Sequence, residues 1–131
     1  MEIKGIIVSG MGKGTYFMSQ TIYREEFEKK LNFKPFVGTL NVGVDAGGIR
    51  TIRQIPQEKF NIIDGQGKFG DVKFVKAILN NKIEGALVFP VKTKHPDDVL
   101  EFIAETNLRN ALNLEDGDFV TIKIKDLEED L

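Results

Sequence analysis

The chain has 131 residues, the size of one ordinary domain, which leaves no room for a second catalytic module. Its 18 basic and 20 acidic side chains give a formal net charge of −2, so no overall positive field attracts a nucleic-acid backbone. The lack of cysteine excludes disulfides, thiol catalysis and cysteine-based metal sites, and the single histidine excludes a cage of several histidines. No apolar run approaches the roughly 18 residues of a membrane span. We therefore expect a cytoplasmic monomer that binds neither nucleic acid nor membrane.

The first part of the chain predicts a strand, a loop and a helix. An apolar run at residues 3–8 ends in a glycine cluster at residues 10–14, which is typical of a buried strand that enters a loop. Between residues 21 and 31, the large apolar side chains recur every four positions among charged residues. This spacing predicts an amphipathic helix.

The next apolar alternation predicts a strand with one polar face. Leu40, Val42 and Val44 are separated by polar residues or glycine, so they share a buried face. Thr39 and Asn41 then lie together on the opposite face. These two polar side chains are therefore close enough to share a ligand.

The middle of the chain predicts a loop, a short strand and a hairpin. Residues 45–59 show no clear periodicity and are expected to form a loop. Residues 60–63 form an apolar run that ends in Asp-Gly, which is typical of a strand. Two further runs at residues 72–79 and 83–89 are joined through Asn80-Asn81, a good hairpin connection.

The last part of the chain predicts a second helix and a final strand. Residues 95–98 place a proline and two acids where a helix begins, and Val99, Phe102 and Ile103 supply an apolar face. A short helical turn is expected at residues 108–112, and apolar residues alternate again from Val120 to Ile124.

These elements amount to about six strands and two helices, joined mostly by short turns. The expected fold is mainly β within the α+β class: a small closed six-stranded β-barrel of the cradle-loop type with two or three short helices. A doubly wound sheet is disfavoured, because it would need helices that alternate regularly with strands.

The glycine cluster suits the binding of phosphate, although it matches neither the Walker A pattern nor the dinucleotide fingerprint. Closely spaced glycines let backbone amides approach a polyphosphate, with a lysine and a hydroxyl beside them. The alternative is a flexible hairpin loop. The residues concerned are Gly10, Met11, Gly12, Lys13, Gly14 and Thr15.

Four other polar residues are weighed as candidates for a ligand site. Thr39 and Asn41 offer hard oxygen ligands that would complete the shell of a magnesium ion already held by phosphates, or else form a solvated polar strand face. Glu101 is expected to be a solvated helix residue. Arg109 is suited to phosphate, although a lone arginine beside a helix is more often a surface residue.

The order and spacing of several segments strongly resemble the archaeal CTP-dependent riboflavin kinases. The segments are residues 10–17 (GMGKGTYF), 33–41 (FKPFVGTLN), 85–90 (GALVFP), 92–95 (KTKH), 108–109 (LR) and 116–118 (DGD). The resemblance covers most of the chain from Gly5 to Ile124, and residues 45–66 depart most from the family pattern. Some members carry an additional N-terminal helix-turn-helix domain. We expect residues 1–131 to form a single kinase barrel domain without it.

The resemblance implies transfer of the CTP γ-phosphoryl group to the 5′-hydroxyl of riboflavin, which gives FMN and CDP. It implies that the Gly10–Thr15 loop and the segment Thr106, Asn107, Leu108 and Arg109 surround the nucleotide. It also implies that Thr39 and Asn41 hold Mg²⁺ and that Thr93 and Glu101 contact the flavin. No catalytic base is assigned. Two alternatives remain: a non-enzymatic β-barrel binding module, and a nucleotide-dependent kinase of another small alcohol.

Overall fold

The computed structural model of the chain describes residues 1–9, 21–64, 70–90 and 98–125. Within these ranges the backbone forms strands, α-helices and one turn of 3₁₀-helix. In chain order they are β1 (Glu2–Ile7), α2 (Thr21–Leu31), β2 (Leu40–Gly43), α3 (Ala46–Arg53), the 3₁₀ turn η1 (Gln57–Lys59), β3 (Asn61–Ile63), β4 (Val72–Leu79), β5 (Ile83–Pro90), β6 (Val99–Ala104), α4 (Leu108–Ala111) and β7 (Phe119–Ile124).

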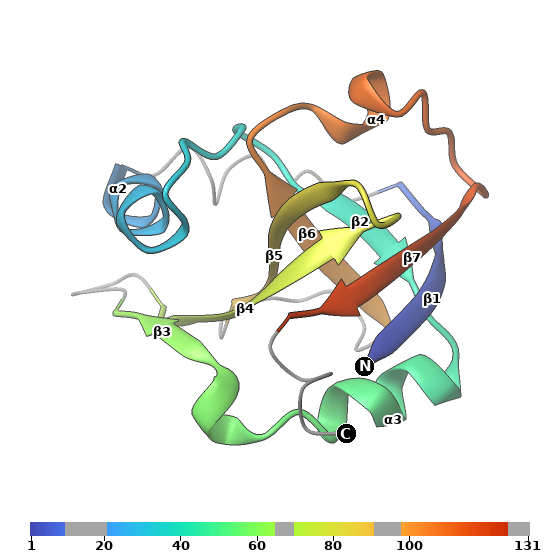
Figure 1. Cartoon of the computed structure of the whole chain (residues 1–131), viewed down its shortest axis with the longest axis horizontal. Coiled ribbons are helices and arrows are strands. Elements are labelled where there is room, and N and C mark those ends of the chain that lie inside the picture. The colour runs from blue at the N-terminus through green and yellow to red at the C-terminus, as the bar shows by residue number, and fades with distance from the viewer. Residues whose placement is uncertain (10–20, 65–69, 91–97, 126–131) are drawn as a thin grey trace.

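The strands form an antiparallel sheet that closes into a barrel (Figure 1). Their order is β3-β4-β5-β6-β2-β1-β7, and β4 also pairs with β7, which closes six of the seven described strands into a ring. Among the described residues, β3 pairs only with β4 and lies outside the ring. Figure 1 shows α3 and α4 at opposite ends of the barrel and α2 against its side. The predicted closed six-stranded barrel is confirmed.

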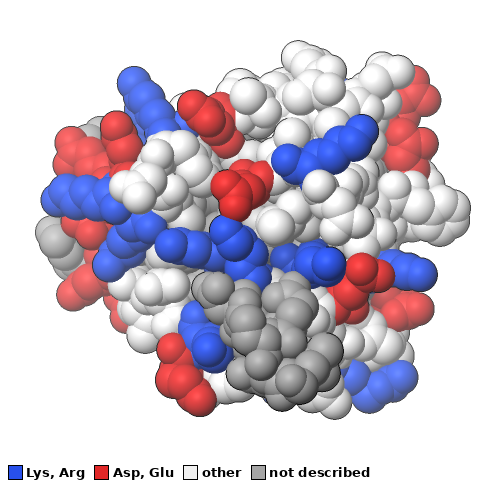
Figure 2. Space-filling view, in the orientation of Figure 1, with Lys and Arg blue, Asp and Glu red and all other residues white. Residues whose placement is uncertain are grey.

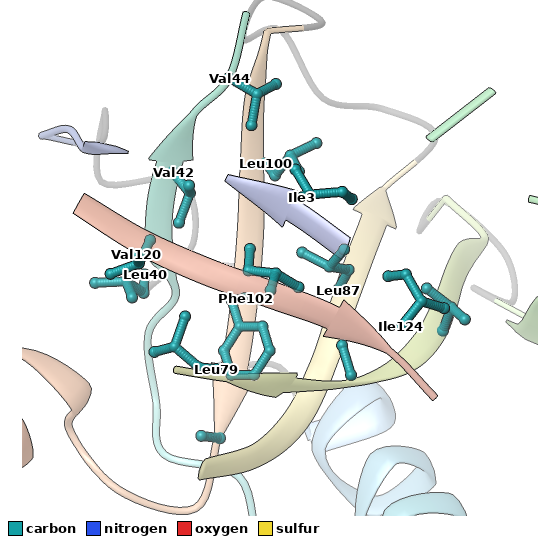
Figure 3. Close-up of a cluster of buried hydrophobic side chains, with 14 of the residues drawn as sticks. Ile3, Leu40, Val42, Val44, Leu79, Leu87, Leu100, Phe102, Val120 and Ile124 are labelled. Atoms are coloured by element: carbon teal, nitrogen blue, oxygen red, sulfur yellow. The ribbon is translucent and has the colours of Figure 1, made fainter. Parts of the chain in front are cut away.

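Strand alternation fills the inside of the barrel with apolar side chains. Every second residue of a strand points inward, so six short strands enclose one continuous cluster (Figure 3). Its fully buried members include Ile3, Val42, Leu79, Leu87, Phe102, Ile122 and Ile124. The backbone polar groups of these strands pair with one another along the sheet.

A second apolar cluster lies on the outside of the barrel, under α2. Tyr23 and Phe27 of the helix face Phe74 of β4, and the rings of Phe27 and Phe74 meet edge to face at 5.3 Å between centroids. The Tyr23 hydroxyl donates a hydrogen bond of 2.6 Å to the carbonyl of Gly70. Val88 and Ile103 belong to the same cluster, so β4, β5 and β6 are buried on both faces beside this helix.

Two sequence-based predictions are wrong. The helix expected from His95 onward is instead strand β6 over the described residues, because Leu100 and Phe102 point into the barrel while Glu101 and Ile103 point outward. Residues 45–59, expected to be a loop, contain α3 and η1. Asp45 caps α3, since its carboxylate accepts a hydrogen bond of 3.0 Å from the amide of Gly48.

The other predicted elements are confirmed. The helix at residues 21–31 and the short turn at α4 are present, as are the strands β1, β2, β3 and β7. The β4–β5 hairpin turns through Asn80 and Asn81, whose φ angles of 50° and 56° are the left-handed values that a tight hairpin requires.

The surface is mixed in charge. Figure 2 shows a loose band of basic side chains across the face in view, with acidic side chains above and below it. Among the helices in the described part of the chain, none has the length and apolar character needed to span a membrane.

Candidate functional site

A buried carboxylate lies on the outer face of the barrel where β2 meets β6. Glu101 is 4% exposed, and it is the buried charged side chain among the described residues. It lies directly across from Asn41 on β2 and from Val88 on β5. The hydroxyl of Thr39 donates a hydrogen bond of 3.2 Å to Glu101 Oε1. Burial of a carboxylate costs free energy unless the group is hydrogen-bonded. The hydrogen bond from Thr39 partly offsets this cost for Glu101.

Thr39, Asn41 and Glu101 therefore form one group of oxygen-bearing side chains. Directly opposed residues of neighbouring strands point to the same face, which brings the side chains of Asn41 and Glu101 together. Thr39 joins them through its hydrogen bond. The structure thus brings together both predicted metal ligands and one predicted flavin contact.

A pocket of about 180 Å³ adjoins this group at the end of the barrel nearest α4. Two segments line it: residues 36–40, which lead into β2, and residues 102–109, which run from β6 into α4. All four described residues of the predicted nucleotide set contribute to its wall, namely Thr106, Asn107, Leu108 and Arg109. Thr39 also lines it and so belongs to both groups.

The α4 segment is held in place from inside and outside. Leu108 is buried against the barrel core, and the Asn107 side chain caps the helix by accepting a hydrogen bond of 3.4 Å from the amide of Asn110. Capping and burial fix the short helix, which alone would be too short to be stable. Arg109 therefore starts from a fixed backbone position.

Arg109 joins α4 to the end of β1. Its Nη2 donates to Asp116 Oδ1 at 2.6 Å and to the carbonyl of Val8 at 3.3 Å. Ser9 donates a hydrogen bond to the other carboxylate oxygen of Asp116. The hydrogen bond from Ser9, followed by that from Arg109, lowers the pKa of Asp116 below its ordinary value.

The end of β1 also touches the strand that carries Asn41. The amide of Val8 donates to the carbonyl of Asn41 at 3.0 Å. Val8 and Ser9 directly precede the glycine cluster in the chain. The last described residues before the cluster, Val8 and Ser9, therefore contact both β2 and the Arg109–Asp116 pair.

Some predicted site residues lie outside the described residues. These are Gly10–Thr15 and Thr93. The expectation that Glu101 is a solvated helix residue is wrong, because it lies on a strand and is buried. Ser9 and Asp116 hydrogen-bond to each other beside Arg109 and were not among the predicted site residues, although Asp116 lies in the 116–118 segment that carries the family resemblance and Ser9 directly precedes the glycines.

The described residues do not form a complete metal site. They contain no group of three or more His, Asp or Glu side chains that could hold a metal ion by themselves. Thr39 and Asn41 offer neutral oxygens beside one carboxylate, which suits a hard cation that takes its remaining ligands from phosphate and water. The residues present therefore fit Mg²⁺ carried with a nucleotide.

Comparison with known proteins identifies the family. Residues 7–124 match a family model named CTP-dep_RFKase and described as "Domain of unknown function DUF120". The chain belongs to the CTP-dependent riboflavin kinase family. The match covers every strand of the barrel ring, in whole or in part, together with both groups of site residues.

Curated relatives carry the name riboflavin kinase. The protein from Methanobrevibacter smithii is 46% identical over 94% of this chain and 99% of its own length. The one from Methanothermobacter thermautotrophicus is 48% identical over 88% of this chain and 93% of its own length. A third, from Archaeoglobus fulgidus, is 39% identical over 95% of this chain but only 54% of its own length.

Proposed function

We propose that this chain is a riboflavin kinase that transfers the γ-phosphoryl group of CTP to the 5′-hydroxyl of riboflavin, giving FMN and CDP. The choice of riboflavin as acceptor and CTP as donor comes from the family. The structural observation that carries the proposal is the position of Thr39. Thr39 donates a hydrogen bond to the buried Glu101 and also lines the pocket that Arg109 lines. It therefore connects the proposed site of the phosphoryl acceptor, at Glu101, with the proposed site of the phosphoryl donor, at the pocket.

The donor side is the pocket near α4. We assign the nucleotide to Thr106, Asn107, Leu108 and Arg109 together with the glycine segment from Gly10 to Thr15. A guanidinium matches phosphate oxygens through several N–H donors in a fixed fork, and Arg109 supplies one at the pocket wall. Phosphoryl transfer depends mainly on alignment and on neutralising phosphate charge, so donors held on a fixed backbone suit it.

The metal position lies between the two sides. Thr39 and Asn41 would hold Mg²⁺ through their hydroxyl and amide oxygens, and both side chains are partly exposed and so can reach a bound phosphate. When bound, Mg²⁺ would neutralise negative charge on the transferring phosphates. Thr39 keeps its hydroxyl proton directed to Glu101, which leaves an oxygen lone pair available for the cation.

The acceptor side is the buried outer face of β6. We assign the flavin to Glu101 and Thr93. A carboxylate in a buried setting can accept a hydrogen bond from a ribityl hydroxyl and fix its direction of attack. Little base assistance is needed in a loose transition state, so Glu101 acts first by positioning the acceptor. We further propose that the enzyme works as a cytoplasmic monomer.

The test is an activity assay with four nucleotides. The protein is incubated with riboflavin, Mg²⁺ and CTP, ATP, GTP or UTP in separate reactions, and FMN and nucleoside diphosphate are separated by chromatography. We expect equal amounts of FMN and CDP from the CTP reaction. FMN formed only with another nucleotide would contradict the choice of CTP as the phosphoryl donor. The absence of product with every nucleotide would contradict the proposed activity.

A further inference from the structure

Two exposed ion pairs of the protein have almost the same geometry and very different surroundings. Arg109 and Asp116 are 2.6 Å apart, with side chains 38% and 53% exposed. Lys125 and Glu84 are 2.7 Å apart, with side chains 35% and 67% exposed. The lysine pair joins β5 to the residue directly after β7, whereas the arginine pair lies between the nucleotide pocket and the end of β1.

The carboxylate of Asp116 binds two different segments at once. One oxygen accepts from Arg109 at 2.6 Å, and the other accepts from the hydroxyl of Ser9. The backbone beside it is fixed as well, because the amide of Gly117 donates to the carbonyl of Ile7 at 2.8 Å. Asp116 therefore ties α4 to Ser9, two residues after the end of β1.

The guanidinium of Arg109 is oriented by the same contacts. Among the described residues, its hydrogen bonds to Asp116 Oδ1 and to the carbonyl of Val8 both run through Nη2. The fork of a guanidinium carries five N–H donors, so fixing one nitrogen sets the direction of the others. Arg109 lines the pocket, and the fixed fork can present its remaining donors to an anion there.

We propose that Asp116 is a positioning residue for the phosphates of the nucleotide: it orients the Arg109 guanidinium at the pocket wall and holds Ser9, the residue directly before the glycine cluster in the sequence. This inference rests on the proposed function, since it places the phosphates of the donor at Arg109. Asp116 itself lines neither the pocket nor the buried Glu101 group, so it acts through its two partners.

Exposed ion pairs contribute little to stability, because water and salt screen them. A purely structural role would therefore make the loss of either carboxylate a small change in stability. A positioning role of Asp116 would in addition lower the affinity for the nucleotide. Glu84 is the control, since hydrogen bonds from partner side chains lower the pKa of both carboxylates, although Asp116 also accepts a hydrogen bond from Ser9.

The experiment compares Asp116→Asn with Glu84→Gln in the full chain. Both changes remove one charge at nearly constant shape. KM for CTP is measured at saturating riboflavin, KM for riboflavin at saturating CTP, and Tm by thermal unfolding. We expect Asp116→Asn to raise KM for CTP about tenfold, as misplacement of a phosphate ligand does, with KM for riboflavin and Tm matching those of Glu84→Gln.

A double-mutant cycle separates positioning from a general effect. If Asp116 acts through Arg109, Asp116→Asn should raise KM for CTP far less in an Arg109→Ala background than in the wild type. Calorimetric titration with CDP provides the same comparison without turnover.

The outcomes are distinct. Wild-type protein that makes no FMN contradicts the proposed function, and the CDP titration then tests the positioning role alone. An active wild type with unchanged or lowered KM for CTP in Asp116→Asn contradicts the positioning role alone. An equal rise in KM for CTP and KM for riboflavin would also contradict the positioning role. The same holds if the effects of Asp116→Asn and Arg109→Ala on KM for CTP are fully additive.

Discussion

The two faces of β6 are both buried, but they are built for different tasks. On the inner face, Leu100, Phe102 and Ala104 belong to the apolar cluster inside the barrel. On the outer face, Ile103 packs under α2, while its neighbour Glu101 places a carboxylate where the strand meets β2. The same six-residue strand thus serves an apolar core and a polar site.

This contrast shows where a ligand can bind. The inside of the barrel is filled by side chains with no polar group to orient a substrate, so it acts as the scaffold. The outer face offers Thr39, Asn41 and Glu101 on a backbone that the scaffold fixes. Substitutions on the inner face away from the pocket-lining Leu40, Phe102 and Ala104 should therefore change stability, and those on the outer face should change ligand binding.

The largest expected effect is on stability, from Leu79→Ala. Leu79 is fully buried inside the barrel, so its truncation leaves a cavity and should reduce the free energy of unfolding by about 2–5 kcal/mol. Denaturant unfolding measures this. The control is Ile62→Ala on β3, where the side chain is 56% exposed and the expected change is below about 0.5 kcal/mol. A Leu79→Ala protein with wild-type stability but without substrate binding would contradict the assignment of stability to the inner face and ligand binding to the outer face.

The second effect is on the acceptor side, from Glu101→Gln. Loss of the carboxylate charge should weaken riboflavin binding about 10- to 100-fold, the usual cost of losing a hydrogen bond to a charged group. Flavin fluorescence titration gives the affinity and the CTP assay gives the turnover. The loss of stability should stay below that of Leu79→Ala. Unchanged affinity and turnover would contradict the positioning role of Glu101, and Glu84→Gln controls for loss of a carboxylate.

A smaller effect is expected from Thr39→Val, which keeps the shape and removes the hydroxyl. Both the hydrogen bond to Glu101 and the proposed metal oxygen are lost, so kcat/KM for CTP should fall about tenfold. The Mg²⁺ concentration needed for half-maximal rate should rise. Thr121→Val, a partly buried threonine on the outside of β7, is the matched control. Equal Mg²⁺ dependence in both variants would remove Thr39 from the metal site.

Much of the fold is predictable from local sequence patterns. The alternation around Val42 and the Asn80-Asn81 turn specify β2 and the β4–β5 hairpin, since each depends on neighbours in the chain. Strand β6 was predicted as a helix because Val99, Phe102 and Ile103 also fit helical spacing. A strand buried on both faces has no alternation to reveal it, and only its partners β2 and β5 decide the matter.

The site is less predictable, because it depends on contacts between distant segments. Thr39 and Asn41 could be paired from strand alternation alone. The burial of Glu101 follows from the closure of the barrel, and the bonds between Ser9, Arg109 and Asp116 join residues up to 107 positions apart. A pattern among neighbouring residues cannot reveal contacts between residues so far apart in the sequence.

A crystal structure with CDP and FMN bound would test the central claim most directly. We expect the flavin beside Glu101 on the outer face of β6, and the CDP phosphates between Arg109 and Thr39 at the pocket near α4. Ligands bound inside the barrel, at α3, or on any surface that contacts neither Thr39 nor Arg109 would contradict the account.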